Sequence, residues 1–371
     1  MSGIDTRYAV SLSEIYGHIN SIGGKLKSKS DKKYRPLLWF RGQEYAHYHL
    51  EPNLFRGSQY EYNSNETYSL NHLREEYRFQ NFMSRNYDKI DSRMPQTMIE
   101  WQEIMQHYGT KTRLMDWSES LTVALGFALE AFIKPIQDLE VKEHRRTATP
   151  TLWILDPVEM NKQVYHAIAN VSASVIEKAL DICPAPKRLK LAVEILQELK
   201  EQEETGLYFN LGHKDERNMN VMISLSSLEI IRKAYEGREY EALQSREMNP
   251  FFFLLLRFFS DGVPIAQDTI PPLSIIHPYH SPRIKGQRGV FTVFPYYVLN
   301  SQHKKMNEYA GKGMQLPVSM EYMEQCKPHL YKIQILDPQN VAEELMLTGV
   351  KRGNLYPDMQ SVSQDMEYVV D

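Results

Sequence analysis

Residues 106–118 read Gln-His-Tyr-Gly-Thr-Lys-Thr-Arg-Leu-Met-Asp-Trp-Ser and separate two stretches of helical periodicity. The pattern predicts a helix over 99–108 that stops at Gly109, because glycine is common just past a helix end. Ser118 is the predicted N-cap of the next helix, whose apolar side chains recur at helical spacing through 121–132. Residues 106–118 are therefore predicted to form a polar loop between two helices.

This predicted loop brings together side chains that suit a binding site, namely His107, Tyr108, Thr112, Arg113 and Asp116. Its end at a helix N-terminus favours an anion, because backbone N–H groups are unpaired there. The structural alternative is a packed turn in which Asp116 pairs with Arg113 and the tryptophan that follows fills the core. Since binding residues concentrate on loops, the pattern slightly favours function.

Upstream, residues 37–40 are apolar and aromatic, and the prolines and glycines around them predict a short strand. Arg41 follows directly, so its guanidinium is expected at the strand end, where it suits a phosphate or a carboxylate. Gly42 is expected to let a ligand approach the backbone closely. The structural alternative, an arginine paired to a carboxylate at a sheet edge, is slightly favoured by the residues alone.

Downstream, Gln287 precedes an apolar stretch at 289–294 that predicts a strand. His277 and His280 have ligand-type side chains, but no third ligand is near them in the sequence, so no metal is expected. Further predicted strands lie at 151–155, around 274–276 and at 330–335, and a helix is predicted at 341–348.

These elements predict an α+β fold with one mixed, mostly antiparallel sheet assembled from distant strands. Residues 1–35 are expected to form an N-terminal helix and a basic loop. Residues 36–360 are expected to form the main domain, with 158–260 as a mainly helical insertion. Residues 361–371 are expected to be a frayed polar tail.

The bulk composition is that of an ordinary globular chain. The 371 residues are 42% hydrophobic and 24% charged, and a net charge of −4 calls for no polyanionic partner. Two distant cysteines favour a reducing compartment, and with no signal-peptide pattern or membrane-spanning stretch the chain is expected in the cytoplasm. Motifs of P-loop enzymes, α/β-hydrolases, zincins and Rossmann proteins are missing from the sequence.

The motifs together resemble the FRG-domain family. Its naming triplet stands at Phe40-Arg41-Gly42, and its most specific stretch resembles His107-Tyr108-Gly109, Thr112-Arg113-Leu114 and Asp116-Trp117. The resemblance extends over about 36–360 and is weakest in 158–260. It implies a bacterial or phage protein, often encoded near defence or toxin genes.

The order of these motifs also resembles that of ADP-ribosyltransferases, which implies NAD as a substrate. Under this resemblance Arg41 and Gly42 would hold the dinucleotide, with Tyr108, Gly109, Thr112 and Arg113 lining its site. Catalysis would fall to Asp116, His107 and Gln287. Transferases carry Glu where this chain has the neutral Gln287, so Asp116 is the candidate to supply the missing negative charge.

Three functions stay open from the sequence. The first is an ADP-ribosyltransferase-like enzyme or toxin that uses NAD and modifies an unknown protein or nucleic-acid acceptor. The second is a non-catalytic nucleotide- or nucleic-acid-binding sensor. In this reading Tyr108 or Trp117 stacks on a base, and the phosphates are contacted by Arg41, Arg113, Arg283 and Arg288. The third is a structural interaction protein whose many tyrosines form an interface.

Overall fold

The computed structural model describes residues 3–29, 37–56, 70–90, 95, 98–133, 145–164, 264–266, 271–276, 281–294, 296–298, 319–357 and 359–367. His277, His280 and most of the predicted helical insertion at 158–260 lie outside these residues. No helix in the described part is both long and apolar enough to cross a membrane.

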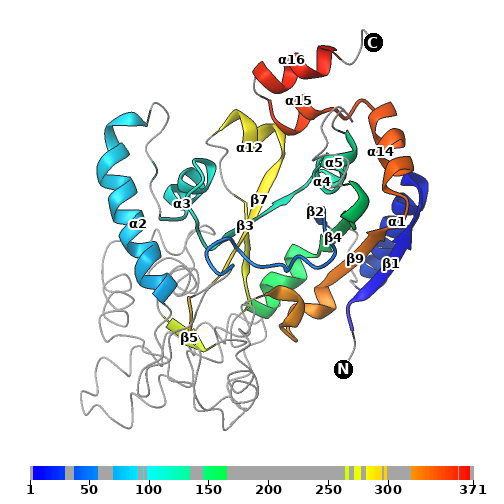
Figure 1. Ribbon diagram of the computed structural model, residues 1–371. Coiled ribbons are helices and arrows are strands. Elements are labelled where there is room, and N and C mark those ends of the chain that lie inside the picture. Colours follow the sequence, from blue (N-terminus) through cyan, green and yellow to red (C-terminus); the bar gives the residue numbers. More distant parts are fainter. Residues whose placement is uncertain are drawn as a thin grey trace, which may run out of the picture.

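A seven-stranded mixed sheet runs through the described part of the chain, in the order β1-β9-β4-β2-β3-β7-β6 (Figure 1). Only β1 and β9 pair in parallel, and the other neighbours are antiparallel. The expected α+β class and the mostly antiparallel sheet of distant strands are therefore confirmed. The strands are β1 (Asp5–Ala9), β2 (Trp39–Gln43), β3 (Leu114–Ser118), β4 (Thr151–Leu155), β6 (Leu273–Ile275), β7 (Gly289–Val293) and β9 (Leu330–Ile335).

Helices, short 3₁₀ turns and two further short strands accompany the sheet. The helices are α1 (Leu12–Lys29), α2 (Leu70–Asn86), α3 (Met98–His107), α4 (Leu121–Ala128), α5 (Glu130–Ile133), α12 (Pro282–Gly286), α14 (Pro338–Leu347), α15 (Arg352–Leu355) and α16 (Met359–Glu367). Short 3₁₀ turns are η1 (Tyr87–Lys89), η3 (Met320–Tyr322) and η4 (Lys327–His329), and β5 (Pro264–Ala266) pairs in parallel with β8 (Tyr296–Val298).

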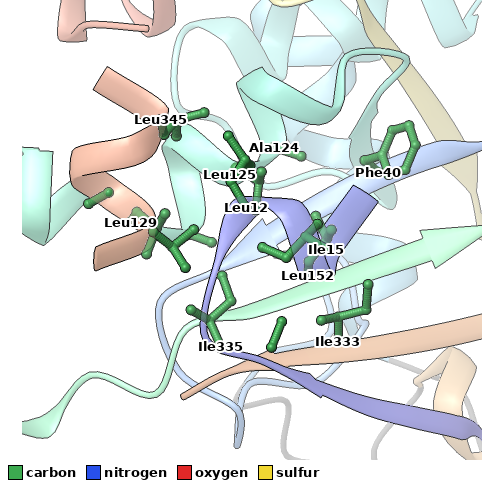
Figure 2. Close-up of a cluster of buried hydrophobic side chains, with 14 of the residues drawn as sticks. Leu12, Ile15, Phe40, Ala124, Leu125, Leu129, Leu152, Ile333, Ile335 and Leu345 are labelled. Atoms are coloured by element: carbon green, nitrogen blue, oxygen red, sulfur yellow. The ribbon is translucent and has the colours of Figure 1, made fainter. Parts of the chain in front are cut away.

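One face of the sheet is covered by α1, α4, α5 and α14, which gather on the side of β1 and β9 (Figure 1). Their apolar side chains meet those of β2, β4 and β9 in a continuous core (Figure 2). Ile15 of α1, Leu125 of α4, Ile333 of β9 and Leu345 of α14 are fully buried there. Because each buried leucine or isoleucine contributes about 1.5–3 kcal/mol, this core fixes α4 on the sheet.

The opposite face carries a second core. Trp39, Met115 and Trp153 of the sheet pack there against Leu50, Phe294 and the residues around η3 and η4. The indole N–H of Trp153 donates to the Gln43 side-chain oxygen at 2.8 Å. The two cores together explain why β4 is buried at every position.

The N-terminus differs from the prediction. Residues 5–9 were expected to begin a helix, but they form the edge strand β1, and the helix starts at Leu12. The strand is short and only Ala9 in it is buried, so its stability comes from pairing with β9 rather than from its own pattern. The expected frayed tail is also wrong in part, because α16 occupies Met359–Glu367.

The segment 106–118, predicted to be a loop, contains the end of α3 and the whole of β3. Residues Leu114–Ser118 form β3, because both neighbours β2 and β7 pair with it and four of its five side chains are buried. Ser120, not Ser118, caps α4, and its hydroxyl accepts from the Val123 N–H. Ser118 instead ends β3, where its hydroxyl donates to the Gln287 carbonyl at 2.7 Å.

Strands β2 and β3 are neighbours that barely pair. Their register holds one pair, Phe40 with Ser118, whereas β2 pairs with β4 along all five of its residues. Beyond that pair the two strands diverge, so the middle of the sheet is split. Backbone N–H and C=O groups that would pair in a regular ladder can form hydrogen bonds with side chains at this split.

Candidate functional site

A cleft of about 460 Å³ lies over the split between β2 and β3. Its volume is within the range of small-molecule sites. Residues of β2, β3, α3, α4, α12 and β7 line it, together with residues from the loop after β2. The site is therefore assembled from distant parts of the chain, although the predicted strand at 37–40 begins and ends two to three residues later than expected.

Arg41 bridges the split by binding Asp116. Its Nη1 donates to the Asp116 backbone carbonyl at 2.5 Å and to the Asp116 Oδ2 at 2.7 Å. The carbonyl is one that a regular β2–β3 ladder would have used, so the guanidinium replaces a backbone hydrogen bond. The side chain of Arg41 is 14% exposed and that of Asp116 is 60% exposed. Arg41 thus forms the floor of the cleft, and the Asp116 carboxylate is open to whatever enters.

The Asp116 carboxylate is also held from the side of α3. Gln106 Nε2 donates to Asp116 Oδ1 at 2.8 Å, and the Thr112 hydroxyl donates to Gln106 Oε1 at 2.7 Å. This chain of hydrogen bonds fixes which way the Gln106 amide points, because its oxygen accepts and its nitrogen donates. Both oxygens of Asp116 therefore have a defined partner and the carboxylate is oriented before any ligand binds.

The electrostatics of the cleft favour an ionised Asp116. Partial desolvation raises the pKa of Asp116, but the charge and hydrogen bond of Arg41 and the nearby Arg56 outweigh it, and the net pKa lies below the ordinary value. A carboxylate paired with a guanidinium is expected to behave in this way. Asp116 consequently carries a negative charge at neutral pH.

His107, at the end of α3, lines the same cleft. Desolvation and the charge of Arg283 lower its pKa below the ordinary value. The imidazole is therefore neutral at neutral pH and has a nitrogen that can accept a proton.

Charged side chains of both signs line the cleft. They are the guanidiniums of Arg41, Arg56 and Arg283 and the carboxylates of Glu44, Glu103, Asp116 and Glu130. Desolvation and the neighbouring Arg41 lower the pKa of Arg56, but a guanidinium stays protonated at neutral pH. The cleft suits a ligand that carries both positive and negative groups better than a plain polyanion.

Gly42 also lines the cleft, but the packing of α4, rather than the expected approach of a ligand, explains why this residue is a glycine. A Cβ at this position would lie 1.8 Å from the Ala124 carbonyl oxygen and 2.6 Å from the Ala128 nitrogen. Glycine is thus required because α4 packs directly on β2. The expected close approach of a ligand is not what fixes this residue.

Gln287 lines the cleft at the C-terminal end of α12. Its Nε2 donates to the Leu355 carbonyl at 2.6 Å, which ties the C-terminal end of α12 to α15. The predicted site residues Arg41, Gly42, His107, Asp116 and Gln287 are thus brought together in one cleft.

The other four predicted residues do not line the cleft. Tyr108 is 73% exposed outside it, and Gly109 ends α3 with a φ of +81°. Thr112 is buried, and its hydroxyl donates to the cleft residue Gln106. Arg113 is fully buried, with its Nε 3.6 Å from Glu75 of α2, so neither the expected ligand contact nor the alternative pairing with Asp116 is seen.

Among the lining residues that were not predicted are Arg56, Gln106 and Glu130. Gln106 stands directly before His107 in the quoted motif, so its position was a usable signal. Arg56 lies in a segment whose route across the sheet could not be inferred from the sequence. Arg283, expected to contact phosphates only under the binding-module alternative, also lines the cleft. Among the described residues, no group of three His, Cys, Asp or Glu side chains is placed to hold a metal ion.

The comparison with known families gave a match over the part of the chain that contains Arg41, Gln106, His107 and Asp116. Comparisons with curated proteins and with solved structures gave no match. A family model, that of the FRG domain, matches residues 37–135. The resemblance recognised from the motifs at Phe40-Arg41-Gly42 and around Asp116 is confirmed by this match, which covers both motifs.

Proposed function

We propose that the cleft binds NAD as a substrate and that the protein is an ADP-ribosyltransferase-like enzyme. The observation that carries this proposal is the ionised Asp116 carboxylate, exposed in the cleft and fixed by Arg41 and Gln106. The sequence lacks the late glutamate of transferases, and Asp116 has the charge and the orientation to take its place. NAD carries a positive nicotinamide ring and two phosphates, which agrees with the mixed charges of the cleft.

In this reaction the bond between the ribose C1′ and the nicotinamide nitrogen breaks. The electron pair of that bond leaves with nicotinamide, whose ring becomes neutral, and positive charge develops on the ribose. The negative charge of Asp116 stabilises it, as a preorganised charge does at a transition state. Water or an acceptor X–H adds to C1′ and gives its proton to the neutral His107.

Arg41 has a different role from the one expected. Because its Nη1 is committed to Asp116, it orients the carboxylate and keeps the Asp116 pKa low. The phosphates of the substrate then fall to the other cleft arginines, Arg56 and Arg283. A part in conflicts between bacteria and phages stays a prediction from the resemblance, and a place in the cytoplasm stays a prediction from the cysteine content and sequence patterns.

The direct test is nicotinamide release from NAD by the purified protein, with and without cell lysate as a source of acceptors. We expect release above the spontaneous rate, and faster release with lysate if an acceptor is present. If nicotinamide is released under neither condition but NAD binding is saturable, the result would support a non-catalytic nucleotide sensor instead. Salt-sensitive binding of RNA or DNA without NAD binding would turn it to a nucleic-acid module.

The pH dependence follows from His107. Its pKa in the folded protein is below the ordinary 6.5, so the base stays neutral, and the rate stays full, at neutral pH. As the pH falls through the folded pKa, His107 gains a proton and nicotinamide release decreases with a midpoint below 6.5. Asp116 does not contribute to this midpoint, because its pKa is lowered from the already acidic ordinary value of 3.8.

The control for this profile is His107→Gln, which removes the titrating group. Its residual release should no longer show the acidic midpoint. A parent profile whose midpoint lies above 6.5, or the same midpoint in His107→Gln, would contradict the assignment of His107 as the base.

A further inference from the structure

Tyr356, which directly follows α15, contacts three side chains that line the cleft. The Arg283 guanidinium carbon lies 4.9 Å from the centroid of its ring, and the Phe127 ring meets it edge-on at 5.9 Å. Its hydroxyl donates to Glu130 Oε2 at 3.0 Å. Phe127, Glu130 and Arg283 all line the cleft, so one tyrosine organises three of its side chains.

The backbone next to Tyr356 is fixed to the body of the fold. The Leu355 carbonyl accepts the hydrogen bond from Gln287 Nε2. The Leu355 side chain is fully buried against Gly126 of α4, where a Cβ would lie 2.6 Å from its Cδ2. The backbone before Tyr356 is therefore held by α4 and by the end of α12, so the Tyr356 ring has a fixed position.

Arg283 is placed to bind an anion. It is exposed on α12 and, in the part of the chain that the structure describes, it forms no ion pair with a carboxylate. Arg41, by contrast, already has Asp116. A guanidinium over an aromatic ring keeps N–H groups for hydrogen bonds, and the ring limits the freedom that it would lose on binding.

We propose that Arg283 binds a phosphate of the nucleotide in the cleft and that Tyr356 is the positioning residue that holds Arg283 for this contact. This inference rests on the proposed function, since it takes the ligand to be a phosphate-bearing nucleotide. It names a residue for the phosphate contact other than Arg41, whose Nη1 is already bound to Asp116.

The test compares two probes by isothermal titration calorimetry: ADP-ribose, which carries both phosphates, and nicotinamide riboside, which carries none. Arg283→Gln should weaken ADP-ribose binding by about tenfold or more, the loss of a charge-assisted contact. Its affinity for nicotinamide riboside should stay that of the parent. A variant that merely deformed the cleft would weaken both probes.

Arg352→Gln is the matched control. The Arg352 guanidinium carbon also lies near the Tyr356 ring, at 5.8 Å, but Arg352 does not line the cleft. Its loss should leave ADP-ribose affinity within about twofold of the parent, which is the scale of a minor packing change.

Two variants separate the role of the Tyr356 ring from that of its hydroxyl. Tyr356→Phe keeps the ring and should bind ADP-ribose as the parent does. Tyr356→Leu removes the ring and should weaken ADP-ribose binding by about threefold to tenfold, in line with the loss of a cation–π contact. Nicotinamide riboside affinity should not follow this loss.

Parent-like ADP-ribose affinity in Arg283→Gln, or an equal loss for both probes, would overturn this inference and leave NAD as the substrate. A parent that binds neither NAD nor ADP-ribose would overturn the proposed function, and this inference with it.

Discussion

Gly42→Ala is expected to lower the free energy of unfolding by about 3 kcal/mol, the upper end of what overpacking usually costs. The added Cβ would lie 1.8 Å from the Ala124 carbonyl oxygen, which belongs to the backbone of α4 and cannot rotate away as a side chain would. Helix α4 would have to lift from β2, and the core that it shares with Leu152 and Ile333 would open. Urea denaturation of parent and variant measures the loss.

Gly17→Ala is the matched control, because Gly17 lies in α1 and a Cβ there would meet nothing within 4 Å. That variant should gain roughly 0.5–1 kcal/mol from the better helix propensity of alanine. If Gly42→Ala instead unfolded like the parent and lost only NAD binding, the glycine would serve the ligand rather than the packing of α4.

The sequence predicted much of the sheet because its central strands are strongly apolar. Strands β4 and β9 were predicted at their observed limits. β4 is a short apolar run that is buried at every position, and β9 alternates between buried and partly exposed side chains over most of its length. The edge strand β1 was missed for the opposite reason. Its side chains are mostly polar and only pairing with β9 makes it a strand, and such pairing between residues far apart leaves no local signal.

The motif around Asp116 was recognised, but its structure was not. Polar residues at 106–112 suggested a loop, yet the apolar Leu114, Met115 and Trp117 belong to a central strand. Arg113 was assigned to the ligand because an arginine beside an aspartate in a polar motif suggests an anion site. Its true partner, Glu75, comes from α2, and nothing in the motif itself pointed to that helix.

The cleft could not have been located from the sequence, because it depends on the single pair between β2 and β3. Where two strands diverge is a property of the whole sheet and of the arginine that fills the gap. The sequence did identify Arg41 and Asp116 separately as the residues with the chemistry to meet. The two side chains do meet, at 2.7 Å, so their chemical types indicated the site even though the sequence did not show that they lie side by side.

Asp116→Asn is expected to reduce nicotinamide release by about a hundredfold to a thousandfold, as removal of one preorganised stabilising group does in other enzymes. Asparagine has the same shape and can still accept from Gln106, and Arg41 keeps its hydrogen bond to the backbone carbonyl at 116. The variant should therefore fold as the parent does. What it lacks is the negative charge that the ribose needs when the glycosidic bond breaks.

The measurement is kcat for nicotinamide release, beside ADP-ribose affinity and thermal stability for the same preparations. A loss in kcat with ADP-ribose affinity retained places the effect in the chemical step, because ADP-ribose lacks the group that leaves. Asp88→Asn makes the same change on an exposed residue of η1 and should leave kcat unchanged. Gln106→Leu keeps the charge of Asp116 but frees one of its oxygens, so its loss in kcat should be smaller than that of Asp116→Asn. Equal turnover in Asp116→Asn and the parent would mean that the carboxylate belongs to the architecture of the split sheet and that the chemistry, if any, lies elsewhere in the cleft.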